Sequence, residues 1–135
     1  MSGYLLDTDT SIEIMRGRNN AVLERLAATV RSEVALSIVT VAEILFGAWR
    51  SQNPSRSLAL SRQFYGSFEI LTLTTPAAES SSEIRAILET SGQRIGPYDV
   101  LIAGIALAGD RILVTHNTRE FKRIPNLRLK VWVAA

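Results

Sequence analysis

Short apolar runs alternate with segments of helical periodicity along the whole chain. Runs of strand length occupy residues 3–7, 33–39, 69–73 and 111–115, and a last run at 130–134 predicts an edge strand. Helical spacing or helix-start signals mark residues 8–17, 19–31, 40–50, 55–68, 76–92 and 117–124, and a further helix opens at Pro97. Strands that alternate with helices predict an α/β domain with a central, mainly parallel sheet of four or five strands and helices on both faces.

The stretch IGPYDVLIAGIALAGD, residues 95–110, stands out within this pattern. It carries no charge between Asp99 and Asp110, and Pro97 suits the first position of a helix. The residues that follow are apolar on every side, which predicts a helix buried all round. The sequence therefore places a carboxylate, Asp99, at the opening of a buried helix, and this placement needs a physical reason.

Composition limits the class of protein. A chain of 135 residues with 47% hydrophobic and 21% charged residues predicts one globular domain, residues 1–135, and it shows no repeat or linker. The longest apolar run is shorter than the roughly 18 residues of a membrane span, and no secretory leader is evident, so we expect a cytoplasmic protein. The absence of cysteine excludes disulfides and thiolate zinc sites. Of fifteen basic residues, thirteen are arginine, the better phosphate ligand.

Three carboxylates follow predicted strands. Asp7 ends the first strand, Glu43 lies one turn into the helix after the second, and Asp99 opens the buried helix. Each alone has a local explanation, because Thr40-x-x-Glu43 has capping-box spacing and Asp99 would complement a helix dipole. Together they should meet at the carboxyl edge of the sheet, where their repulsion costs several kcal/mol unless a cation neutralises it. An oxygen-rich site of this kind favours Mg²⁺ or Mn²⁺.

Other polar residues near the predicted strand ends are less specific. We interpret Asp9 as a helix cap, since Thr10-x-x-Glu13 also has capping-box spacing. His116 is the only histidine, which excludes a mechanism with two imidazoles, and we interpret it as a surface residue. The chain has no nucleophile elbow, P-loop or dinucleotide-binding glycine motif.

Four blocks carry a resemblance to a known family. YLLDTDTSIEIMRG, SIVTVAEILFGA, GPYDVLIAGIAL and ILVTHNTREFKRIPNLRLKVW resemble, in order and spacing, the PIN-domain toxins of the VapC type. The match covers nearly the whole chain. The resemblance implies a three-layer α/β/α PIN-like fold, Mg²⁺- or Mn²⁺-dependent endoribonuclease activity, a VapB-like antitoxin and a homodimer. It also implies inhibition of translation by cleavage of a structured RNA, often a tRNA.

By position, the first three family acids match Asp7, Glu43 and Asp99. The fourth acid of many PIN domains falls at Asn117, whose amide brings no charge, so a second metal position would be weaker unless Glu120 supplies the carboxylate. The resemblance thus implies that Asp7 and Asp99 bind the principal ion and that Glu43 holds a ligating water or a second ion. Asn117 and Glu120 would complete the catalytic site, although Asn117-x-x-Glu120 could equally start a helical turn.

Substrate and partner contacts are expected outside the carboxylates. Arg16 and Arg119 are the candidates for anchoring the RNA backbone. The segment 46–68 contains Trp49, Phe64 and Tyr65 among polar residues, and a helical hairpin there could offer some of them to a second subunit or an antitoxin.

Two alternative functions remain open on sequence grounds. The amide at Asn117 is compatible with an RNA- or protein-binding module that keeps the fold without cutting. The motif LLDTDT also satisfies the Asp-x-Asp-x-Thr pattern of phosphatases that use an aspartyl intermediate. Those enzymes need a later lysine followed by an acidic pair, and Lys122 and Lys130, the only lysines, have no such pair after them.

Overall fold

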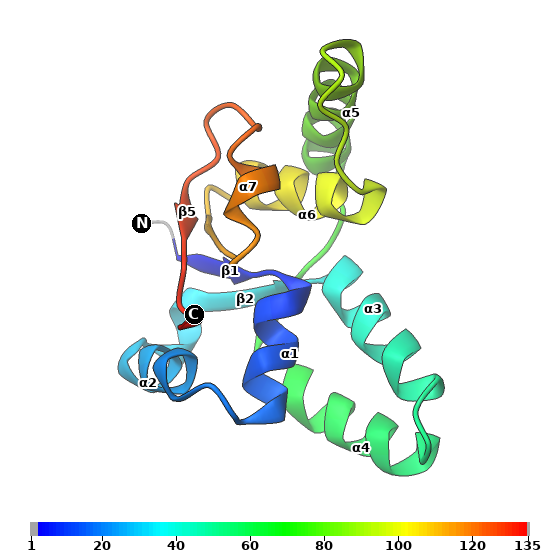
Figure 1. Ribbon diagram of the computed structural model, residues 1–135, viewed down its shortest axis with the longest axis vertical. Helices are drawn as coiled ribbons and strands as arrows, with labels where there is room; N and C mark the ends of the chain where they lie inside the picture. Colours follow the sequence, from blue (N-terminus) through cyan, green and yellow to red (C-terminus); the bar gives the residue numbers. More distant parts are fainter. Residues whose placement is uncertain (1–2, 135) are drawn as a thin grey trace.

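The computed structural model describes residues 3–134 and contains a parallel sheet between two helical layers (Figure 1). Strand order across the sheet is β3-β2-β1-β4-β5, and every neighbouring pair is parallel. The strands are β1 (Tyr4–Leu6), β2 (Val34–Ser37), β3 (Glu69–Leu71), β4 (Ile112–Val114) and β5 (Leu129–Lys130). The helices are α1 (Thr8–Arg16), α2 (Asn20–Ala28), α3 (Ile38–Trp49), α4 (Pro54–Tyr65), α5 (Thr75–Thr90), α6 (Pro97–Ala108) and α7 (Thr118–Phe121), with a 3-10 turn η1 (Arg31–Glu33). The predicted α/β fold class is confirmed.

Alternation along the strands builds one hydrophobic core on each face of the sheet. Leu5 and Leu113 point to the face covered by α5, α6 and α7, whereas Leu6 and Val114 point to the face covered by α1, α2 and the end of α4 (Figure 1). All four side chains have no exposed surface. Because helices cover both faces, the central strands β1 and β4 are hydrophobic along their length, whereas the outer strands β3 and β5 include the charged residues Glu69 and Lys130.

The caps of the helices that follow β1 and β2 differ from the predicted ones. Asp7 itself caps α1, since its Oδ1 accepts a hydrogen bond from the Thr10 backbone N–H at 2.8 Å. The interpretation of Asp9 as the cap is therefore wrong, and Asp9 lies exposed in the first turn. Ser37 caps α3, with its Oγ 3.0 Å from the Thr40 backbone nitrogen.

The alternative explanation of Glu43 by a capping box does not apply, because Thr40 is the third residue of α3 rather than its cap. The spacing to Glu43 therefore has no capping role. This leaves the Glu43 carboxylate available for contacts outside its own helix.

Two further expectations need correction. Helix α6 is enclosed through its middle, with Ile102 and Ala103 at 0% exposure, but its first turn reaches solvent and Tyr98 is 59% exposed. The helix is not buried all round, because Ala108 at its C-terminal end is exposed as well. The final strand is shorter than predicted, and Trp132 lies beyond it, in the core, against Tyr4.

Among residues 3–134, no helix combines the length and apolarity that a membrane span requires.

Close contact between α5 and α6 fixes the position of α6. A Cβ added at Gly104 would overlap Ser81 Oγ and lie 2.7 Å from the Ala77 carbonyl oxygen. Glycine is therefore needed here for space, and not for its backbone freedom.

We expect Gly104→Ala to lower the free energy of unfolding by about 1–3 kcal/mol, because overpacking outweighs the gain in helix propensity. Chemical denaturation measures this change. Ser81→Ala is the matched control: the buried Ser81 Oγ has no hydrogen-bond partner, so its removal should cost nothing. Equal stability of Gly104→Ala and the parent protein would show that α5 and α6 are not packed this closely.

Candidate functional site

Five carboxylates from four segments of the chain gather at the carboxyl edge of the sheet. Burial, and then the charges of Asp7, Glu43, Glu120 and Asp9 in that order, raise the pKa of Asp99 to about 6. Asp7 follows β1, Glu43 lies in α3 after β2, and Glu120 lies in α7 after β4. The structure thus brings the acids that follow β1, β2 and β4 into electrostatic contact with the first turn of α6.

Asp7 is the most deeply placed of these acids, with 3% of its surface exposed. Burial raises its pKa, and hydrogen bonds from the Thr115 side chain and the Thr10 backbone N–H act against that rise. Thr115 Oγ1 also accepts a hydrogen bond from the Asn117 backbone N–H at 2.9 Å. Asp7 is therefore held from two sides, by the start of α1 and by the turn that follows β4.

Glu43 is held by a residue that sequence reasoning did not identify. Thr8 Oγ1 donates to Glu43 Oε1 at 2.6 Å, so the first residue of α1 contacts the carboxylate on α3. The bond spans 35 positions in the sequence, and no local spacing rule could have indicated it.

Asn117 and Glu120 form a pair beside the other carboxylates. Asn117 occupies the cap position of α7 without making a side-chain cap, and its Nδ2 donates to Glu120 Oε2 at 3.3 Å. The amide therefore orients the carboxylate, and Glu120 is the member of the pair that brings negative charge to Asp99.

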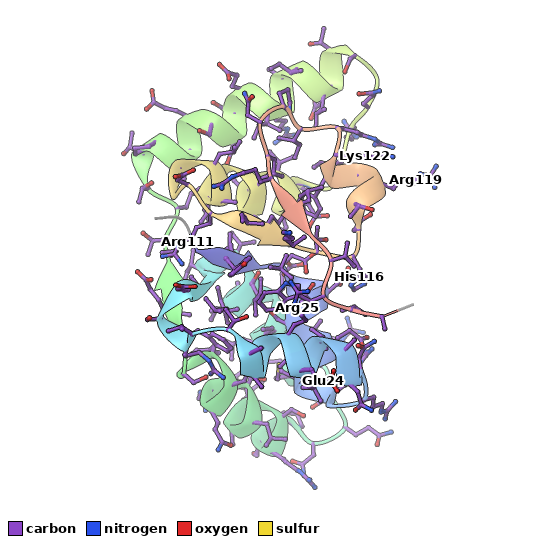
Figure 2. The ribbon with its side chains drawn as sticks, turned by 90° about the vertical axis from the view of Figure 1, so that its left-hand side faces the viewer. Glu24, Arg25, Arg111, His116, Arg119 and Lys122 are labelled. Carbon is purple, nitrogen blue, oxygen red and sulfur yellow. The ribbon has the colours of Figure 1, made fainter. Side chains whose placement is uncertain are left out.

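The two arginines predicted to bind RNA are both exposed. Arg119 projects outward from α7 beside Lys122, and His116 lies exposed after β4, at the end opposite Arg111 (Figure 2). Arg16 is exposed at the end of α1 and pairs with Glu13 at 3.3 Å.

The donor set suits a hard divalent cation that keeps part of its water. No three His, Asp or Glu side chains in the described part of the chain lie close enough to hold one ion directly. Mg²⁺ is commonly bound through only one or two carboxylates plus waters, which fits dispersed acids that repel one another. The carboxylates cluster without imidazole or thiolate ligands, so the residues fit Mg²⁺ or Mn²⁺ and do not fit zinc.

A cleft of about 670 Å³ adjoins the carboxylates. Thr8, Asp9 and Glu43 form its polar side, and its remaining lining is mostly apolar and comes largely from α3 and α6. Of the carboxylates, Glu43 and Asp9 are therefore accessible from this cleft.

The PIN-domain family model matches residues 4–127, which include every carboxylate named above. The chain belongs to the PIN-domain family. Its fold is therefore that of a PIN domain, as the four sequence blocks predicted.

Similar proteins place this PIN domain in the VapC group. The tRNA(fMet)-specific endonuclease VapC of Salmonella typhimurium is 37% identical over 132 residues, which cover 98% of this chain and 99% of the relative. Ribonuclease VapC2 of Haemophilus influenzae is 35% identical, with 98% of this chain and all of the relative covered.

Solved structures agree. DNA-bound VapBC from Salmonella typhimurium superposes with a TM-score of 0.92 at 37% identity, over 98% of this chain and 99% of that one. VapBC2 from Rickettsia felis, bound to a promoter DNA fragment, gives a TM-score of 0.88 at 30% identity, over 96% and 98% of the two chains.

The raised pKa of Asp99 predicts a pH-dependent stability. The folded protein keeps the proton of the Asp99 carboxyl group up to pH about 6, whereas the unfolded chain loses it near the ordinary aspartate pKa of 3.8. Ionisation of Asp99 therefore opposes folding progressively between pH 4 and somewhat above pH 6. In EDTA, Asp99→Asn should raise Tm at pH 7.5, and the difference from the parent protein should shrink toward pH 4.

Glu83→Gln, at an exposed position on α5, is the control and should leave Tm unchanged at both pH values. Thermal unfolding followed by circular dichroism measures all three proteins. If Asp99→Asn lowered Tm at pH 7.5 in EDTA, the carboxylates would not repel one another as described.

Proposed function

We propose that this PIN domain is a Mg²⁺- or Mn²⁺-dependent endoribonuclease toxin that cleaves a structured RNA, a tRNA in the first instance, and so inhibits translation. The observation that carries the proposal is the clustering of carboxylates at the sheet edge. Burial and the repulsion of the neighbouring carboxylates raise the pKa of Asp99. Such a cluster is costly to maintain without a cation. The names of the VapC relatives, a tRNA(fMet)-specific endonuclease and a ribonuclease, support the substrate class. A cytoplasmic location is part of the same proposal.

Within this proposal, Asp7 and Asp99 are the direct ligands. Thr10 and Thr115 hold Asp7 by hydrogen bonds. Asp99 has a pKa raised by burial and by the charges of the other acids. Glu43 would hold a ligating water or a second ion, and Glu120, held by the Asn117 amide, would complete the site. When bound, the divalent ion would make water a stronger nucleophile and would offset charge on the phosphoryl oxygens.

Arginine side chains around the cluster are proposed to hold the RNA backbone. Arg119 extends outward from α7, one position before Glu120, and can reach a phosphate that lies over the cluster (Figure 2). Arg16 is proposed to bind more weakly, because Glu13 already occupies part of its guanidinium. Phosphate contacts of this kind position the RNA without selecting its sequence.

Exposed aromatic side chains on α3 and α6 indicate a surface that binds other proteins. Phe46 and Trp49 on α3 are 63% and 64% exposed, and Tyr98 on α6 is 59% exposed. Phe64 and Tyr65 are instead partly buried against the core that contains Leu6 and Val114, so we do not include them in this surface. We propose that a second copy of the chain and a VapB-like antitoxin cover the exposed aromatics. The VapBC complexes among the solved relatives support the antitoxin.

Neutralising one ligand should abolish cleavage without unfolding the protein. In Asp7→Asn the amide oxygen can still cap α1, since Asn and Asp are comparable N-caps, but the metal ligand charge is lost. RNA cleavage by the purified protein in Mg²⁺ or Mn²⁺ should fall about 100-fold or more. Gel analysis of a tRNA substrate over time measures the rate.

Glu24→Gln, at an exposed carboxylate on α2, should cleave at the parental rate (Figure 2). Undiminished cleavage by Asp7→Asn would end the nuclease proposal for this site. If the parent protein bound RNA but cut none in either ion, the non-cleaving binding module would replace the nuclease. Membership of the PIN-domain family already disfavours the phosphatase alternative.

A further inference from the structure

Three hydroxyl groups form a hydrogen-bonded chain that ends on Glu43. Thr8 Oγ1 lies 2.6 Å from Glu43 Oε1 and 3.0 Å from Thr40 Oγ1, and Ser37 Oγ lies 3.3 Å from Thr40 Oγ1. Ser37 and Thr40 have no exposed surface. The chain joins the start of α1, after β1, to the start of α3, after the neighbouring strand β2.

Only one arrangement of protons satisfies these contacts. A hydroxyl has a single hydrogen, and Thr8 gives its hydrogen to the carboxylate, so Thr40 must donate to Thr8. Ser37 then donates to Thr40, while Ser37 Oγ accepts from the Thr40 backbone N–H. Every hydroxyl therefore donates toward Glu43, and hydrogen bonds aligned in this way strengthen one another.

We propose that Thr8 is a positioning residue for Glu43: its hydroxyl, supported by Thr40 and Ser37, fixes the carboxylate beside Asp7 and Asp99 and thereby strengthens divalent-ion binding. The proposal rests on the metal-dependent function proposed above. It adds a requirement of its own, because an unrestrained Glu43 would turn away from the acids that repel it. With Oε1 engaged by Thr8, the second oxygen of the carboxylate remains for the site.

The test measures Mn²⁺ affinity of the full chain by calorimetry in the absence of RNA. Thr8→Val keeps the shape of the side chain and removes the donor, so it should weaken Mn²⁺ binding by about 10–100-fold. Thr8→Ser keeps the hydroxyl and should bind nearly as tightly as the parent protein. Thr29→Val makes the same change at a hydroxyl that bonds only to the Arg25 carbonyl on α2, and it should have no effect.

A double-mutant cycle separates positioning from a general structural role. If Thr8 acts through Glu43, Thr8→Val should add little to the loss already caused by Glu43→Gln. Thr40→Val leaves the Thr8–Glu43 hydrogen bond in place but removes the hydroxyl that donates to Thr8, so we expect a smaller loss of Mn²⁺ affinity. This variant also serves as the test if Thr8→Val does not fold.

Three results would overturn the proposal: parental affinity in Thr8→Val and Thr40→Val, equal weakening in Thr8→Ser and Thr8→Val, or a full additional loss in the Glu43→Gln background. Failure of the underlying function is distinct, because the parent protein itself would then bind no Mn²⁺, or would bind it and cleave no RNA.

Discussion

Repulsion among carboxylates at the carboxyl edge of the parallel sheet is the constraint on which this structure depends. The topology brings the ends of β1, β2 and β4 together, and each is followed by a segment that carries an acid. Burial, and then the charges of these acids, raise the pKa of Asp99, on the helix that precedes β4, to about 6. Under the proposed function, a bound divalent cation would offset this cost and would supply the Lewis acid for phosphodiester hydrolysis.

The scaffold keeps the charges in place by removing freedom around them. One hydrophobic core packs against each face of the sheet, and this packing restrains the strand ends relative to one another. Gly104 lets α6 approach α5 closely, which fixes the helix that carries Asp99. Asp7 is tied by the cap of α1, and Glu43 by the hydroxyl of Thr8.

Much of this arrangement could be predicted from the sequence, because strand ends in a parallel sheet define an edge. The pattern of apolar runs placed Asp7, Glu43 and Asp99 at that edge before any coordinates. It could not choose among neighbouring hydroxyl-bearing residues as helix caps, since several have suitable spacing, and Ser37 was missed. Thr8 was missed for another reason: its partner is 35 residues away, so only the folded register shows the contact.

The central claim is that these carboxylates share one divalent cation. Anomalous scattering from crystals of the protein grown with Mn²⁺ tests it most directly, because the ion is located without reference to activity. The account predicts a single strong peak within coordination distance of Asp7 and Asp99, with Glu43 reached through water. Crystals in which Mn²⁺ is absent from this edge of the sheet, or is bound only elsewhere on the surface, would contradict it.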